Sequence, residues 1–150
     1  MGTSTGRWPG RTEIDGAGPW ALAQGTHQGK PIFVRINEGL RPIAGHPEFA
    51  DQIGVAVPLH APTDQGLPDE AESVELNAIE DALCDELLAS NQSLLALVLT
   101  TGGAREFVFY TADKDAARRK ATALGRRITT HRIQCRVRRD PEWRIFKQFA

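Results

Sequence analysis

The chain has 150 residues, of which 41% are hydrophobic and 25% are charged, and its formal net charge is −1. A chain of this length and composition forms one globular domain that buries its own core without disulfides or a structural metal. The longest apolar run covers residues 94–99, whereas a membrane-spanning helix needs roughly 20 residues, so we expect no membrane span.

The first residues and the cysteines indicate the setting of the protein. Residues 1–18 are rich in glycine and lack an apolar stretch, so we expect a flexible N-terminal segment rather than a secretory signal. Residues 19–150 are expected to form a single α+β domain. Cys84 and Cys135 have no neighbouring ligands for a zinc site and do not make a disulfide framework. We therefore expect a cytoplasmic protein without a metal or other cofactor.

The first predicted elements are a β-hairpin and a strand. Two extended runs, 20–24 and 31–37, flank a turn over 25–29. Residues 38–52 contain two prolines and two glycines without periodicity, which predicts a loop. Residues 53–60 form a strand, with Pro58 near its end because proline lacks a backbone donor.

The middle of the chain predicts two helices around a second hairpin. Asp69 begins a helix with acidic residues in its first turn and apolar residues at spacings of three and four. Strands over 94–101 and 105–111 meet at Gly102-Gly103, a pair that tolerates positive φ. Asp113 caps a second helix, whose apolar stripe is narrower.

The last elements are a strand and a short helix. Residues 131–139 alternate between apolar and polar side chains, which is the period of a half-buried strand. Asp140, Pro141 and Glu142 provide a cap, a first-turn proline and an acidic residue for a terminal helix. Its aromatic residues are expected to face the body of the protein.

Without the first hairpin and the last helix, the element order is strand–helix–strand–strand–helix–strand. Right-handed crossovers turn this order into an antiparallel sheet with both helices on one face. We predict an α+β fold, a ferredoxin-like βαββαβ core with an N-terminal β-hairpin and a C-terminal helix. The strand over 94–101 would be an apolar edge, which the hairpin, the last helix or a second subunit must cover. The hairpin is the preferred cover.

Several segments together resemble one protein family. They are GHPEF at 45–49, ELNAIED at 75–81, TTGGAREF at 100–107, FYT at 109–111 and DPEW at 140–143. These segments resemble a bacterial family catalogued only as a domain of unknown function, number 695, over roughly residues 20–149. The resemblance supports the fold and implies no chemistry. The element order is also similar, more distantly, to small ferredoxin-like regulators that inhibit ribonuclease E.

The charge is unevenly distributed along the chain. Residues 105–150 hold thirteen of the 18 Lys and Arg residues but only five of the 19 acidic residues. Such asymmetry can mark a nucleic-acid surface. It can also arise within the fold, because the first long helix is acidic, the second is basic, and the topology packs them side by side.

The basic last strand is the first candidate site. Arg132, Arg136, Arg138 and Arg139 are candidate nucleic-acid-binding residues, because clustered Arg side chains displace counterions from phosphates. The alternative is an edge strand protected by charge against edge-to-edge pairing. Phe107 and Phe109 loosely resemble the aromatic strand of an RNA-recognition motif. Residues 53–59 lack the matching aromatic, so we expect both rings in the core.

The second candidate is the loop over 38–52. The four histidines are scattered and show no metal-ligand spacing, so no metal site is predicted. His46 and Glu48 form a possible loop site, since a His–Glu pair can transfer protons.

Three functions remain open from the sequence. The leading hypothesis is a cytoplasmic, non-catalytic binding or regulatory module that acts through protein–protein contact with an unknown partner or as a homodimer. The first alternative is an RNA- or DNA-binding protein that uses the basic last strand. The second alternative is an enzyme with a site near His46.

Overall fold

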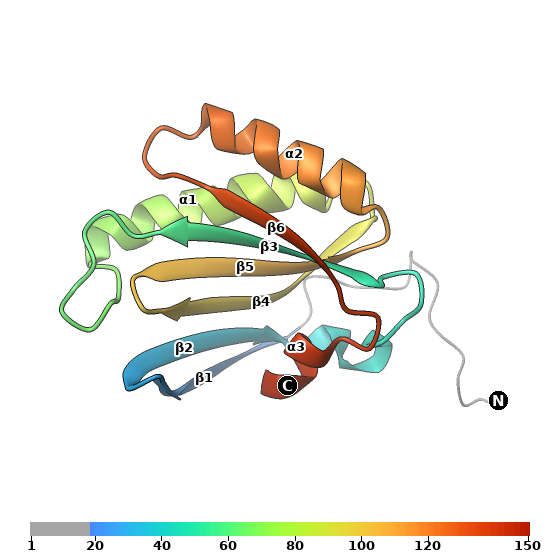
Figure 1. Cartoon of the computed structure of the whole chain (residues 1–150), viewed down its shortest axis with the longest axis horizontal. Coiled ribbons are helices and arrows are strands. Elements are labelled where there is room, and N and C mark those ends of the chain that lie inside the picture. Colours follow the sequence, from blue (N-terminus) through green and yellow to red (C-terminus); the bar gives the residue numbers. More distant parts are fainter. Residues whose placement is uncertain (1–18) are drawn as a thin grey trace.

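The computed structural model describes residues 19–150, and the predicted flexible segment over 1–18 lies outside the described residues (Figure 1). The elements are β1 (Trp20–His27), β2 (Lys30–Asn37), the 3-10 helix η2 (Glu38–Ile43), β3 (Asp51–Pro58), α1 (Glu70–Leu87), β4 (Ser93–Thr101), β5 (Ala104–Thr111), α2 (Lys114–Arg127), β6 (Gln134–Arg139) and α3 (Arg144–Phe149). Within this part of the chain, no helix combines the length and the hydropathy that crossing a bilayer requires.

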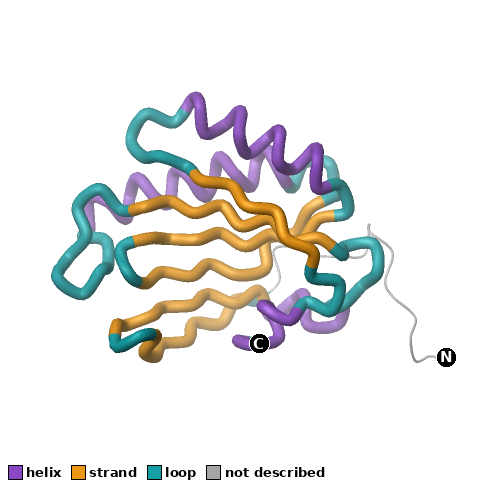
Figure 2. The backbone as a smooth tube through the Cα atoms, in the orientation of Figure 1, coloured by secondary structure: helices purple, strands orange, loops and turns teal. Residues whose placement is uncertain are grey.

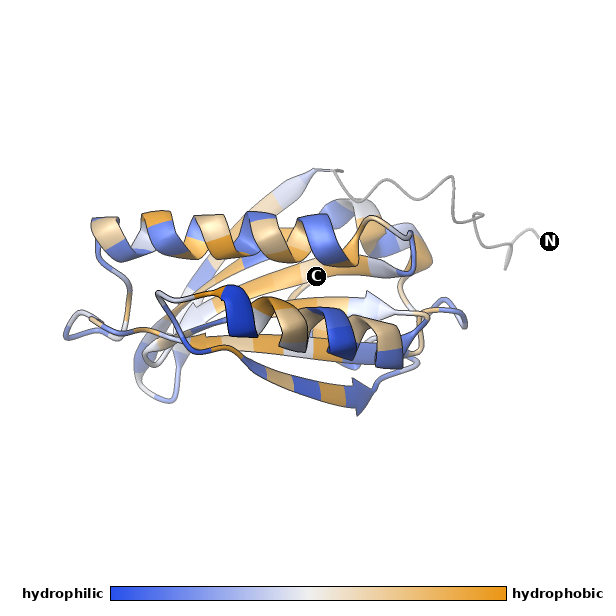
Figure 3. Ribbon diagram, turned by 90° about the horizontal axis from the view of Figure 1, so that it is seen from above, coloured by the Kyte–Doolittle hydropathy of each residue, from blue (hydrophilic) through white to orange (hydrophobic). Residues whose placement is uncertain are grey.

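Six strands form one antiparallel sheet in the order β1-β2-β4-β5-β3-β6. Helices α1 and α2 lie side by side over one face of it (Figures 2 and 3). The short helices η2 and α3 cover one end of the opposite face (Figure 1). The predicted α+β class, the N-terminal hairpin and the C-terminal helix are confirmed. The four core strands lie in the order β4-β5-β3-β6, which agrees with a βαββαβ core that carries both helices on one face.

The N-terminal hairpin covers the edge of the apolar strand β4 and so completes the sheet. β2 pairs with β4 antiparallel, with Val34 opposite Leu99 and Ile36 opposite Leu97. The hairpin turn is shorter than predicted, because β1 continues to His27 and only Gln28 and Gly29 form the turn, both with positive φ. The preferred cover of β4 is therefore confirmed, and that strand needs no second subunit.

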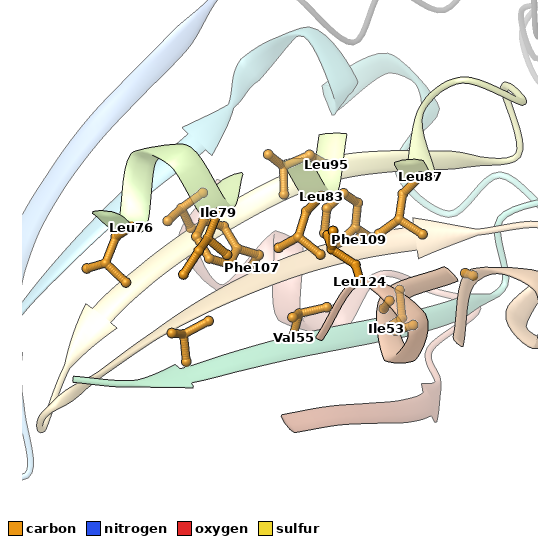
Figure 4. Packing of buried hydrophobic residues seen from close by; sticks show 14 of the residues in the cluster. Ile53, Val55, Leu76, Ile79, Leu83, Leu87, Leu95, Phe107, Phe109 and Leu124 are labelled. Atoms are coloured by element: carbon orange, nitrogen blue, oxygen red, sulfur yellow. The ribbon is translucent and has the colours of Figure 1, made fainter. Parts of the chain in front are cut away.

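The larger core lies between the sheet and the two long helices (Figure 4). The apolar face of α1 packs against alternate residues of β3, such as Ile53 and Val55. Side chains three and four apart share one face of a helix, and side chains two apart share one face of a strand. Phe107 and Phe109 are fully buried in this core. The prediction that both rings are core residues is confirmed, so neither can stack on a nucleic-acid base.

A smaller core on the opposite face holds α3 against the sheet. The Trp143 ring stacks on Tyr110 with 4.0 Å between ring centroids, and its Nε1 donates to the carbonyl oxygen of Phe49 at 2.8 Å. The Tyr110 hydroxyl in turn donates to Asp140. Burial and then the bond to Asp140 raise the pKa of Tyr110 above its ordinary value. α3 is thus fixed at its first turn.

Besides the hairpin turn, four predicted boundaries are wrong. β3 covers Asp51–Pro58 rather than residues 53–60. The last strand begins at Gln134 rather than at residue 131. The predicted loop over 38–52 contains the 3-10 helix η2, which Asn37 caps through its side chain. α3 begins at Arg144, because Trp143 adopts a left-handed conformation (φ 57°, ψ 44°) when it turns its ring into the core. The Asp140 carboxylate still caps this helix from a distance, accepting the N–H groups of Arg144 and Ile145.

The opposite charges of the two long helices meet in one described ion pair. Arg127 of α2 contacts Glu86 of α1 at 2.9 Å, and both side chains are about half exposed. Arg35 of β2 binds Glu80 of α1, so the acidic helix also pairs with the hairpin. Exposed pairs of this kind contribute about 0–1 kcal/mol each. The charge asymmetry is therefore partly internal to the fold.

Candidate functional site

The sheet face that α1 and α2 leave open carries a groove of about 400 Å³. Side chains of all six strands line it, and α3 bounds one side. Its polar lining consists of His27, Gln52, Thr101, Glu106, Arg136, Arg138 and Gln148. Its apolar lining consists of Ile32, Gly54, Ala56, Leu99, Ala104, Val108, Ile145 and Phe149. The volume lies at the lower end of the range for ligand pockets in proteins, roughly 300–1,000 Å³.

The floor of the groove exists because β3 carries small residues on this face. Gly54 lies between Val108 of β5 and Arg136 of β6 in the sheet register, and Ala56 follows on the same face. A Cβ atom at Gly54 would lie 2.5 Å from Oε2 of Glu106. The Glu106 carboxylate therefore leans over the space that the glycine leaves open.

Arg136 and Arg138 form the basic wall of the groove. Successive side chains of a strand point to opposite faces, so residues two apart share one face. Val137, between them, packs instead against the helix-side core. The groove thus combines two exposed guanidinium groups with one half-buried carboxylate, that of Glu106.

The other two predicted arginines lie elsewhere. Arg132 precedes β6 and lines two cavities on the α2 side of the sheet. Nη1 of Arg139 lies 3.8 Å from Oδ1 of Asp51. The four residues proposed from the sequence therefore do not form one stripe. Only Arg136 and Arg138 come together in the groove.

At the predicted loop site, His46 and Glu48 make contacts that hold the loop together. His46 is buried, and its Nδ1 accepts the backbone N–H of Glu48 at 3.0 Å. Its ring packs edge-on against Phe49 with 5.5 Å between centroids. His46 does not line the groove. These contacts hold the segment between η2 and β3.

A cluster of His60, Glu72 and His131 lies on the helix side of the sheet and was not predicted. Their side-chain ligand atoms all lie within 4.8 Å of one another. Glu72 and His131 are buried, and Nε2 of His131 lies 2.6 Å from Oε2 of Glu72. Nε2 of His60 lies 3.7 Å from the same oxygen and 2.8 Å from Oε1 of Glu75.

Hydrogen bonds determine the charge of this cluster. Burial alone would raise the pKa of Glu72, but the bonds from His131 and from the backbone N–H groups of His60 and Ala61 outweigh it, so the pKa is lowered. The bond to Glu75 raises the pKa of His60. The cluster thus contains a buried carboxylate beside two imidazoles, a donor set that suits a transition metal.

The sheet register brings the two histidines of this cluster together, which their spacing in the sequence does not indicate. Ala56 pairs with Gln134 in the antiparallel β3–β6 ladder, and continuing that register beyond the strands brings His60 next to residues 130 and 131. Glu72 lies in the first turn of α1, where the chain returns from β3. The histidines are 71 positions apart in the chain, so their spacing shows nothing.

The comparison with protein families agrees with the resemblance seen in the sequence. The model of one family, described as "Family of unknown function (DUF695)", matches residues 19–150. No curated protein and no solved structure matches the chain significantly. Because the match covers the whole described domain, the chain belongs to the family of unknown function DUF695.

Proposed function

We propose that the protein is a bacterial, cytoplasmic, non-catalytic binding module whose open sheet face receives an acidic, partly apolar segment of a partner protein. The observation that carries this proposal is the pair Arg136 and Arg138 beside an apolar floor in one groove.

The chemistry of the lining favours a carboxylate-bearing peptide. A guanidinium group binds a carboxylate through two parallel N–H···O bonds, which fixes the orientation of the ligand. In the same groove, the half-buried side chains of Leu99 and Ile145 offer apolar surface to an aliphatic side chain. A short peptide that alternates acidic and aliphatic residues matches both features.

Nucleic acid fits the same groove less well. Binding to a phosphate backbone gains from several cationic contacts, and Glu106 places a carboxylate among the two arginines of the groove. The aromatic residues of β5 on the other face are buried, so they offer no stacking platform. For an enzymatic site at His46, the bond from the Glu48 N–H to Nδ1 argues against a free proton acceptor at that nitrogen.

A peptide array tests the proposal directly. We expect the purified chain to retain sequences in which Asp or Glu alternates with Leu, Ile or Val, and not their Lys counterparts. A selected peptide, labelled with fluorescein, is then titrated by anisotropy. The double variant Arg136→Glu/Arg138→Glu should weaken its binding about tenfold or more, because opposite charges become like charges.

The control is Arg118→Glu/Arg119→Glu, which makes the same charge change on the exposed surface of α2 outside the groove. It should bind the peptide as the unchanged chain does. An equal loss of peptide binding in both double variants would refute the proposal that the groove binds the peptide. A single-stranded oligonucleotide is titrated in parallel, and its binding in preference to acidic peptides, with a steep salt dependence, would favour nucleic acid instead.

A further inference from the structure

The cluster around Glu72 brings three potential metal ligands from three segments together, and a fourth, Glu75, lies beside His60. His60 comes from the loop after β3, His131 from the loop before β6, and Glu72 and Glu75 from the first turns of α1. We propose that these four side chains bind one divalent transition-metal ion of the Zn²⁺ type, which clamps the β3–α1 loop to the α2–β6 loop. This site is separate from the groove and independent of the function proposed for it.

The distances suit such an ion. In a tetrahedral zinc site with bonds of about 2.0–2.1 Å, neighbouring ligand atoms lie about 3.3 Å apart. The Glu72 oxygen lies 2.6 Å from Nε2 of His131 and 3.7 Å from Nε2 of His60, so the two values bracket that separation. The ring centroids of the two histidines are 4.6 Å apart. The side chain of His60 is half exposed, so it has room to rotate towards an ion held by Glu72 and His131.

The charges also suit a divalent cation. Two carboxylates and two neutral imidazoles carry a charge of −2, which one M²⁺ ion neutralises. Imidazole nitrogens favour a first-row transition metal over Mg²⁺ or Ca²⁺, which prefer oxygen ligands. The site therefore selects for the Zn²⁺ class rather than for the alkaline-earth ions.

The surroundings of the cluster orient its ligands. The Glu72 carboxylate accepts the backbone N–H groups of His60 and Ala61, at 2.7 and 3.2 Å. The other nitrogen of His131, Nδ1, lies 3.0 Å from Oγ1 of Thr130, whose hydroxyl can accept from Nδ1–H when Nε2 binds a metal. Such outer contacts are a regular feature of metal sites.

A purely structural role accounts for only part of the cluster. Anchoring the loop after β3 requires Glu72 and the two backbone N–H groups. It does not require a second imidazole beside His131, nor Glu75 within 2.8 Å of His60. A carboxylate has about four lone-pair sites, so Glu72 can hold the loop and still coordinate an ion.

A tautomer change of His131 provides a distinct signature. The hydrogen bond between Nε2 of His131 and Oε2 of Glu72, at 2.6 Å, needs a proton between these two atoms. A metal ion at Nε2 replaces that proton, and the neutral imidazole then carries its proton on Nδ1, which lies 3.0 Å from Oγ1 of Thr130. Nitrogen-15 NMR of the imidazole ring distinguishes the two tautomers.

The test uses the full untagged chain, stripped with a chelator and titrated with Zn²⁺. We expect one ion per chain by elemental analysis, a rise in melting temperature, the shift of the His131 proton to Nδ1, and the visible absorption bands of a tetrahedral site when Co²⁺ is used. His60→Ala and Glu75→Gln should each weaken Zn²⁺ binding about tenfold or more. Both side chains are partly exposed, so the fold should persist and can be checked by circular dichroism.

His27→Ala is the matched control, because it removes an exposed imidazole at a distance from the cluster. In the sheet, β2, β4 and β5 lie between β1, which carries His27, and the strands β3 and β6. It should leave Zn²⁺ binding unchanged. Failure of the unchanged chain to take up one ion would overturn the proposal. Equal affinity of His60→Ala and the unchanged chain would also overturn it. Neither result bears on the peptide groove.

Discussion

Tyr110 donates its hydroxyl proton to Oδ2 of Asp140 at 2.7 Å, and this bond connects the centre of the sheet to the start of α3. The same hydroxyl accepts the backbone N–H of Phe146 at 3.3 Å. The Asp140 carboxylate also accepts the backbone N–H groups of Arg144 and Ile145 at the start of α3. One buried pair therefore joins β5, the end of β6 and the terminal helix.

Tyr110→Phe should destabilise the protein by about 1–3 kcal/mol, because it leaves the buried Asp140 carboxylate without its shortest hydrogen bond. Urea unfolding followed by tryptophan fluorescence measures the loss, since Trp143 stacks on this ring. A change of less than about 0.5 kcal/mol, the size typical of surface substitutions, would contradict the role assigned to the bond.

Gly54→Ala should change the free energy of unfolding by less than about 1 kcal/mol, because only the flexible end of Glu106 must move away from the new Cβ. It should nevertheless weaken binding of the acidic peptide, since the displaced carboxylate moves further into the groove that it already lines. Glu106→Ala in the same chain should restore binding.

Gly102→Ala is the comparison for that stability measurement. Nothing lies within 4 Å of its new Cβ, yet φ is +60° in the β4–β5 turn. This substitution should lower the free energy of unfolding by about 1 kcal/mol through backbone strain alone. If Gly54→Ala proved the more destabilising of the two, the floor of the groove would be tighter than the geometry indicates.

Cys84 should react slowly with iodoacetamide in the folded protein at pH 8. Burial, and then the carboxylates of Glu80, Asp81 and Asp85, raise its pKa to about 11, and only the thiolate is a nucleophile. The alkylation rate should therefore keep rising up to about pH 11. Complete labelling of the native chain at pH 8, at the rate of a free cysteine peptide, would be inconsistent with this environment.

The raised pKa of Cys84 also predicts how the stability of the protein changes with pH. The folded state holds the Cys84 proton more tightly than the unfolded chain, whose thiol has the ordinary pKa of about 8.5. The contribution to stability is complete below that pKa and is lost as the pH rises towards about 11. Cys84→Ser should flatten this part of the pH profile in thermal unfolding.

The outer edge of β1 should permit self-association. This strand has no Lys, Arg, Asp, Glu or Pro, and the Leu22 side chain is 71% exposed. Edges of this kind pair readily with another strand. We expect a concentration-dependent mass by sedimentation, and Leu22→Lys should shift it towards the monomer. A strict monomer at high concentration would exclude pairing through β1.

Local sequence patterns determined most of the elements. Asp69 and Asp113 cap the two long helices through their side chains, and Gly102 and Gly103 both adopt positive φ in the turn, as their residue types predict. These features depend on neighbours within four positions in the chain, so they can be read directly from the residues. The apolar strand β4 also showed that a cover was needed, with the hairpin preferred over the last helix or a second subunit, and the β2–β4 pairing decided it.

The tertiary structure alone decided where side chains from distant segments meet. Trp143 turns left-handed and delays α3 because its indole finds the Phe49 carbonyl, 94 positions away. The strand register separates Arg136 and Arg138 from Arg139 and brings His60 beside His131. Such contacts depend on which strands become neighbours and in what register. No local pattern contains that information, and both candidate sites of this protein depend on it.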